Sequence, residues 1–214
     1  MTRIRYCVTL FAVAALAGAE PWDDVKVQIN VRVPMQDGVK LSADVYRPAS
    51  AGKVPGLLLR TYWGKHEPGK IAMALHFVKS GYAVVLQDVR GRFDSDGEWT
   101  PYINEPKDGY DTQMWLGNQP WCNGKIGTFG ESYDGFTQLM PAPLGSPYLK
   151  CMLPFACQQT NFGHLYNEGV LQIGTVFTAG LFMVGRTLQP TIGGVYGSGT
   201  QLIDWNSVFR AGCR

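Results

Sequence analysis

The sequence lacks the features that mark nucleic-acid-binding proteins and membrane-spanning proteins. Its 19 basic and 17 acidic residues leave a formal net charge of only +2. This balance gives no electrostatic basis for binding nucleic acid or an anionic membrane, so neither is expected as a partner. The longest apolar run after the N-terminal segment, Val170 to Val184, includes Gln172 and is too short and too polar to span a bilayer.

The first 19 residues have the three parts of a secretory signal peptide. Arg3 and Arg5 make a basic start, Tyr6 to Leu16 is apolar, and Ala-Gly-Ala forms a small-residue cleavage site before Glu20. An N-terminal anchor helix is the alternative, but the apolar run is too short for one. We therefore predict a secreted or periplasmic protein. Removing the segment takes away two of the 19 basic residues, which leaves 17 against 17 acidic residues.

Cysteine is also scarce, with five residues in the whole sequence, and Cys7 leaves with the signal segment. The remaining Cys122, Cys151, Cys157 and Cys213 do not have the close paired spacing of a zinc site, and no metal is expected. In an oxidising compartment four cysteines could form one or two disulfides. Unpaired buried thiols explain the same pattern equally well, and spacing does not decide between them.

Strand and helix signals alternate through the first 157 residues. A segment with a period of two, an Asp37-Gly38 turn and a returning strand predict a hairpin, and the later apolar runs predict strands buried on both faces. The predicted elements are strands 25–33, 39–46 and 54–59, helix 69–79, strand 81–88, helix 106–117, a strand that leads to Ser132, a helix after it, and strand 149–154.

This order predicts an α/β fold with an N-terminal hairpin and a mostly parallel sheet covered by helices on both faces. We divide the chain into a signal peptide at 1–19, the N-terminal part of the sheet domain at 20–157, and the beginning of a helical insertion at 158–214.

The stretch from Lys125 to Phe136 is typical of a nucleophile elbow, in which a sharp strand-to-helix turn exposes a serine. Ser132 stands between Gly130 and Gly135, and small residues are needed there because strand and helix pass almost in contact. The alternative is an ordinary turn that happens to contain glycine and serine. The buried strand before it and the amphipathic run after it favour the elbow.

Four stretches occur in order at regular spacing: Arg60 to Lys65, Asp88 to Trp99, Asp108 to Lys125, and Gly130 to Gly135. Together they resemble the CocE/NonD family of serine hydrolases, also called X-Pro dipeptidyl-peptidase-like hydrolases, which have the α/β-hydrolase fold. The last stretch fits the family's G-x-S-Y-x-G pattern. The resemblance covers about residues 27–154.

The resemblance implies that Ser132 is the acylated nucleophile and that the backbone N–H of Tyr133 is one oxyanion donor. It implies no cofactor, and a small ester, an amide or a short peptide as substrate. The family's second donor is a tyrosine hydroxyl three residues after the arginine of the first motif, where this sequence has Trp63, with Tyr62 one position earlier. Either side chain can donate a hydrogen bond. The alternative is that both aromatics only line the pocket floor.

One acidic loop and one acidic residue are predicted to have structural rather than catalytic roles. The loop from Asp88 to Trp99 is interpreted as structural, because its Asp and Arg side chains can satisfy turn backbone and one another. Asp134 is interpreted as a first-turn carboxylate favoured by the helix dipole rather than as a catalytic acid.

Histidine is the scarcest residue that the chemistry needs. There are three in the sequence, and only His164 follows Ser132, whereas α/β-hydrolases place serine, acid and base in that order. His164 lies in the stretch that leads into the predicted helical insertion, and Asp204 follows that insertion rather than a strand. We therefore predict a C-terminally truncated hydrolase whose acid and base lie beyond Arg214. The alternative is an inactive hydrolase fragment or a non-enzymatic binding module that lacks the triad Asp and His.

Overall fold

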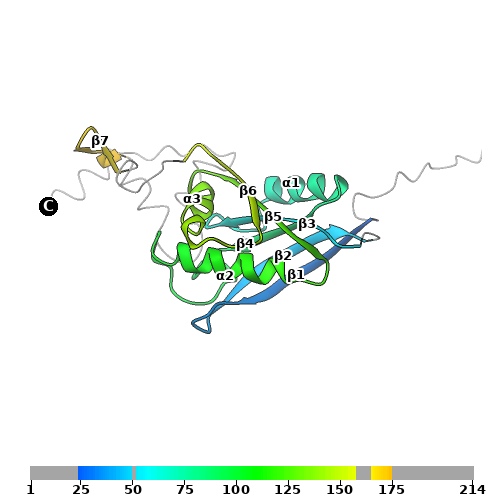
Figure 1. Cartoon of the computed structure of the whole chain (residues 1–214). Coiled ribbons are helices and arrows are strands. Elements are labelled where there is room, and N and C mark those ends of the chain that lie inside the picture. The colour runs from blue at the N-terminus through cyan, green and yellow to red at the C-terminus, as the bar shows by residue number, and fades with distance from the viewer. Residues whose placement is uncertain (1–23, 50–51, 158–164, 175–214) are drawn as a thin grey trace, which may run out of the picture.

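The computed structural model describes residues 24–49, 52–157 and 165–174 and contains a six-stranded mixed sheet with helices on both faces (Figure 1). The strand order is β1-β2-β4-β3-β5-β6. β2 pairs antiparallel with β1 and β4, whereas β4, β3, β5 and β6 run parallel. The strands are β1 Val25–Pro34, β2 Lys40–Pro48, β3 Val54–Thr61, β4 Ala83–Asp88, β5 Cys122–Glu131 and β6 Leu149–Phe155. The predicted α/β fold with an N-terminal hairpin is confirmed.

The N-terminal hairpin closes at the predicted turn. Met35 N donates to the Val39 carbonyl at 2.8 Å, and Gly38 has a φ of 86°, a conformation that glycine adopts without strain. The alternation in β1 is interrupted by a bulge, where Asn30 has a φ of 55° and donates its N–H to buried Asp44 Oδ1 at 2.9 Å. Period-two patterning alone did not predict this bulge.

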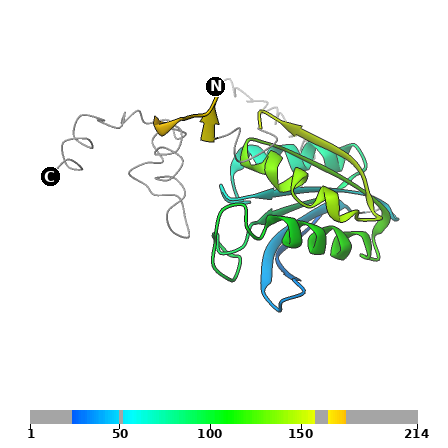
Figure 2. The same cartoon turned by 60° about the vertical axis from the view of Figure 1, so that its left-hand side comes forward.

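The helices lie on the two faces of the sheet (Figure 2). Leu59 and Val84 join an apolar cluster with α1, while Leu58 and Val85, one residue away on the same strands, join Leu116 of α2. Successive side chains of a strand point to opposite faces, so a strand covered on both sides must be apolar throughout. The helices are α1 Pro68–Lys79, α2 Glu105–Gly117, α3 Tyr133–Leu139 and a short 3-10 helix, η1 Ala142–Leu144.

Parallel pairing brings three connections to one edge of the sheet. β3 ends at Thr61, β4 at Asp88 and β5 at Glu131, and the segments that follow them start at neighbouring points. In open α/β sheets this carboxyl edge is where ligands and reactive groups are placed. The motif after Arg60, the loop after Asp88 and the turn at Ser132 therefore meet there.

Residues 165–174 form a two-stranded ribbon of β7 Tyr166–Asn167 and β8 Val170–Leu171. Glu168 and Gly169, with φ of 49° and 85°, make the connecting turn, as short hairpins require. The rest of the predicted helical insertion lies outside the described residues, as does the predicted signal peptide, and both stay predictions.

The described cysteines and helices bear on two further expectations. Cys122, Cys151 and Cys157 are free thiols, so no disulfide joins these three, and Cys213 lies outside the described residues. Among the residues that the structure describes, no helix is long and apolar enough to cross a membrane.

Candidate active site

The turn between β5 and α3 holds Ser132 in a strained backbone conformation. Its φ of 54° and ψ of −123° are sparsely populated for a residue other than glycine, and its side chain lies at the surface. A Cβ on Gly130 would lie 2.7 Å from Asp134 Cβ, and one on Gly135 would lie 2.6 Å from Cys157 Sγ. The predicted sharp turn with two obligatory glycines is therefore present.

Tyr133, the first residue of α3, is fixed by its buried side chain. Its hydroxyl donates to Glu105 Oε1 at 3.0 Å and accepts the Tyr102 N–H at 3.0 Å. The other carboxylate oxygen of Glu105 lies 2.8 Å from Arg60 Nη1. Burial raises the pKa of Glu105, and the charge of Arg60 opposes that rise. Arg60, which opens the first motif, thus holds the residue that follows Ser132 through Glu105.

The aromatic residues of the first motif pack against Tyr133. The Tyr62 ring is 4 % exposed, lies 4.6 Å from the Tyr133 ring edge-on, and stacks on Trp99 at 5.5 Å with an interplanar angle of 13°. The Trp63 ring centroid lies 4.1 Å from that of Tyr62. The structure thus brings together the three residues expected to form the oxyanion site, and both candidates for the second donor stay open.

The segment after Trp63 is fixed by buried charges. Lys65 Nζ lies 2.9 Å from Asp88 Oδ2 and 2.5 Å from Asp94 Oδ2, and the Lys65 N–H donates to Asp88 Oδ1 at 2.7 Å. Burial lowers the pKa of Lys65, but its bonds to Asp94 and Asp88 outweigh burial. The pKa of Lys65 is therefore raised overall. The loop after β4 therefore does bond to turn backbone, as expected, but its acidic residues pair with the preceding motif. The sequence alone did not indicate these partners.

Asp134 differs from its interpretation. It lies in the first turn of α3, but its side chain is 4 % exposed, and Oδ1 has no hydrogen-bond partner among the described residues. Burial raises the pKa of Asp134 to about 7, against the charge of Lys70, whose Nζ lies 3.8 Å from Oδ2, and a hydrogen bond with Thr61. Desolvation therefore outweighs any stabilisation of its charge by the helix.

The two histidines that precede Ser132 in the sequence, His66 and His76, lie in the segment after β3 and on α1. His66 Nδ1 lies 3.4 Å from Asp44 Oδ2, and His66 Nε2 lies 3.2 Å from Asp94 Oδ2, so the ring nitrogens face one carboxylate of β2 and one of the loop after β4. His76 is exposed on α1. His164 and Asp204 lie outside the described residues, so the assignment of acid and base stays a prediction. In the described ranges, no cluster of His, Cys, Asp and Glu is arranged to hold a metal.

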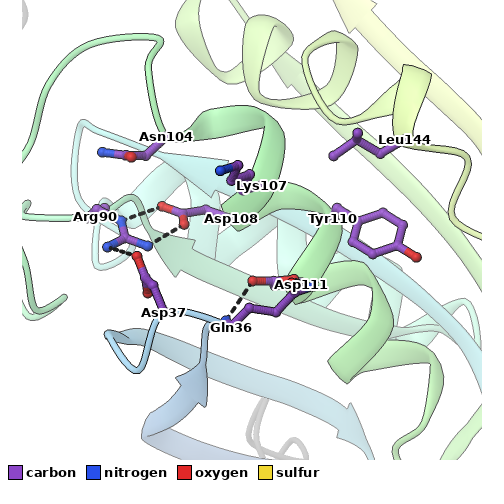
Figure 3. A pocket seen from close by; sticks show the side chains of 9 residues that line it. All are labelled: Gln36, Asp37, Arg90, Asn104, Lys107, Asp108, Tyr110, Asp111 and Leu144. Carbon is purple, nitrogen blue, oxygen red and sulfur yellow. Dashed lines mark hydrogen bonds and ion pairs between the residues drawn. The ribbon is translucent and has the colours of Figure 1, made fainter.

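Two pockets differ in their distance from the turn that carries Ser132. One of about 240 Å³ is lined by Gly130, Glu131 and Asp134 beside Ser132, together with apolar side chains such as Phe155. A larger one of about 540 Å³ lies between the hairpin and α2, where Arg90 bonds to Asp37 and Asp108, and Gln36 bonds to Asp111 (Figure 3). Of these two pockets, the smaller one adjoins the strained turn.

Known proteins share both sequence and fold with this chain. Residues 37–190 match the X-Pro dipeptidyl-peptidase (S15) family. Over 132 residues the chain is 45% identical to cocaine esterase from Rhodococcus sp. (strain MB1 Bresler). The match covers 60% of this chain and 23% of that protein. The chain thus spans less than a quarter of that relative's length.

Two solved structures extend the similarity. The aminopeptidase from a marine sediment Thaumarchaeota archaeon has a TM-score of 0.71 and 26% identity, over 88% of this chain and 34% of that chain. An α-amino acid ester hydrolase has a TM-score of 0.67 and 28% identity, over 84% and 32% respectively. These similarities agree with the family predicted from the four motifs.

Proposed function

Because the chain belongs to the X-Pro dipeptidyl-peptidase (S15) family of α/β-hydrolases, also described as CocE/NonD hydrolases, we propose that it carries the nucleophile of a secreted serine hydrolase. The proposed enzyme cleaves an ester or an amide through an acyl-enzyme on Ser132. The proposed substrate is a small ester, an amide or a short peptide.

The backbone of Ser132 is the observation that carries this proposal. A φ of 54° in a serine costs free energy of about 1–3 kcal/mol, and such strain persists where the surrounding structure imposes it. Gly130 lets β5 come close to Asp134 of α3, and Gly135 leaves room for Cys157, so both glycines allow the surrounding structure to hold the turn. The result places a hydroxyl at the surface of the carboxyl edge of the sheet, where a substrate carbonyl can reach it.

In the proposed reaction, Ser132 Oγ attacks the substrate carbonyl carbon and the carbonyl oxygen takes up the negative charge. The Tyr133 N–H and a side-chain donor from Tyr62 or Trp63 stabilise that oxygen. A base must accept the hydroxyl proton and return it to the leaving alcohol or amine, because a serine is a weak nucleophile at neutral pH. Collapse of the tetrahedral intermediate leaves the acyl group on Ser132, and water then releases it as the acid.

Covalent labelling tests the nucleophile. The purified full-length protein, including the residues that supply the triad acid and base, is incubated with a fluorophosphonate probe, beside the variant Ser132→Ala as control. We expect labelling of the wild-type chain and none of the variant, because only an activated serine displaces fluoride from phosphorus. A wild-type chain that is folded by circular dichroism and yet unlabelled would contradict the proposal and favour an inactive hydrolase fragment or a binding module.

The second oxyanion donor is identified by two conservative variants. Tyr62→Phe removes a hydroxyl and Trp63→Phe removes an indole N–H, while each keeps an aromatic ring in the cluster with Tyr133. We expect one of the two variants to slow labelling about 100-fold, the usual effect of losing one oxyanion donor, and the other to leave the rate nearly unchanged. Equal rates for both variants and the wild type would show that these rings only line the pocket.

A further inference from the structure

Arg92 lies in the loop after β4 and reaches back to the motif that carries Tyr62 and Trp63. Its side chain is completely buried, and Nε donates to the backbone carbonyl of Tyr62 at 3.1 Å. This bond joins residues 30 positions apart in the sequence. The guanidinium therefore holds the main chain at the start of the segment from which both candidate oxyanion donors project.

The same guanidinium lies over the rings of that segment. Its central carbon is 4.7 Å from the Trp99 ring centroid and 5.8 Å from the Tyr62 centroid. Trp99 in turn stacks on Tyr62, and Tyr62 packs edge-on against Tyr133. A planar guanidinium can stack and donate a directed hydrogen bond at once, which an ammonium cannot do. Arg92 thus fixes both the backbone and the ring of Tyr62.

Burying an arginine costs free energy, and burial lowers the pKa of Arg92. Here it joins two segments at the edge of the sheet, and the Tyr62 ring over which it lies packs against Tyr133, the residue that follows the serine. A displacement of about 1 Å in a catalytic group can slow a reaction about 100-fold, so a residue that sets this segment controls the rate.

We propose that Arg92 is a positioning residue for the reaction at Ser132, because its guanidinium holds the Tyr62 backbone and thereby fixes the second oxyanion donor. The proposal rests on the proposed function of Ser132. It requires no contact between Arg92 and the substrate. The donor can be either Tyr62 or its neighbour Trp63, because both belong to the segment that Arg92 holds.

The variant Arg92→Lys keeps the positive charge but lacks the planar donor. Labelling with the fluorophosphonate probe is measured over a range of probe concentrations. In this step Ser132 Oγ bonds to phosphorus, fluoride leaves, the serine proton passes to a base, and charge develops on the phosphonyl oxygen. We expect the maximal labelling rate constant to fall roughly tenfold to a hundredfold with half-saturation unchanged, because a misplaced donor acts on the transition state.

Arg90 offers a matched control in the same loop. Its Nε and Nη2 bond to Asp108 at 2.9 and 2.6 Å, and its Nη1 lies 2.8 Å from Asp37 Oδ2 in the larger pocket (Figure 3). Arg90→Lys therefore disturbs a guanidinium whose bonds go to Asp108 and Asp37 rather than to Tyr62, and which reaches Arg60 only through Asp108, at 4.0 Å. We expect its maximal labelling rate constant to match that of the wild type.

Two further measurements separate positioning from a general loss of folding. A lower folded fraction reduces the final amount of label, whereas misplacement reduces the rate constant. Amide hydrogen exchange in the peptide 61–66 should accelerate in Arg92→Lys and not in Arg90→Lys. If Arg92→Lys does not fold, Trp99→Leu removes the ring under the guanidinium and should lower the rate constant in the same direction.

The outcomes are distinguishable from failure of the proposed function. An unlabelled wild-type chain overturns the role of Ser132, while exchange at 61–66 still tests whether Arg92 holds the segment. A labelling rate constant and exchange pattern that are the same in Arg92→Lys, Arg90→Lys and wild type would overturn the positioning role.

Discussion

The ionisation of Asp134 is expected to lower the free energy of unfolding of the wild type by about 3 kcal/mol between pH 5 and pH 8. Replacing Asp134 with asparagine is expected to abolish this decrease. The carboxyl is buried next to Ser132, and burial raises its pKa from 3.8 to about 7. A difference of that size corresponds to roughly 4 kcal/mol over the full titration, at about 1.4 kcal/mol per pKa unit.

The sign follows from the raised pKa. The folded state binds the Asp134 proton more tightly than the unfolded state does, so this stabilisation is complete below about pH 4. It is lost as the pH rises through about 7, where the buried group ionises. The charges that face Asp134 are Lys70 on α1, which opposes the raised pKa, and Glu131 and Glu105, which add to it.

The measurement is urea denaturation of the wild type and Asp134→Asn at pH 5 and pH 8. Glu105 and Asp88 also have pKa values raised by burial, but they are present in both chains, so the difference between the chains isolates Asp134. Asp37→Asn is the control, because that side chain is exposed and its pKa is lowered by Arg90. A difference between wild type and Asp134→Asn that does not change with pH would contradict the prediction.

The parts of the fold that could be predicted from the sequence are those set by local patterns. Alternation in the hairpin, the apolar run ending at Leu59 and the turn at Asp37-Gly38 each report on their own neighbours in the chain, and the structure has these elements within a few residues. The elbow belongs to the same group, because Gly130 and Gly135 stand within three residues of Ser132.

The partners of the buried charges could not be predicted in the same way. Asp134 was interpreted from its place in a helix, but its burial comes from packing against α1 and β3, which no local rule contains. Lys65 and Arg92 lie in loops, where charges are usually solvated, and their partners are 23 to 30 residues away. The sequence feature that indicates buried charge pairs here is the alternation of Asp and Arg directly after the buried strand that ends at Asp88.

The replacement Arg60→Met is expected to lower the free energy of unfolding by about 3–5 kcal/mol, because it leaves the buried carboxylate of Glu105 without its cation. Arg60 is 2 % exposed, bonds to Gln87 Oε1 at 2.8 Å, and lies 2.8 Å from Glu105 Oε2 and 4.0 Å from Asp108 Oδ2. Protonation of Glu105 can relieve only part of the loss, because Arg60 also satisfies neutral acceptors.

The double variant Arg60→Met with Glu105→Gln tests that explanation. Glutamine removes the unpaired charge and still offers an oxygen to the Tyr133 hydroxyl, so the double variant should be more stable than Arg60→Met alone. Urea denaturation of the four chains gives the coupling between the two sites. Arg32→Met is the control, since its ion pair with Asp96 is exposed and should cost less than about 1 kcal/mol.

The double variant also separates two possible causes of the instability of Arg60→Met, which are the unpaired charge of Glu105 and the lost volume of the arginine side chain. If the charge of Glu105 is what destabilises Arg60→Met, then removing it restores stability whether or not Tyr133 keeps its place. If instead Arg60 mainly fills space between β3 and α2, the two replacements are additive and the double variant is the least stable chain. Additivity would therefore contradict the buried ion pair as the cause, even with the expected loss in Arg60→Met.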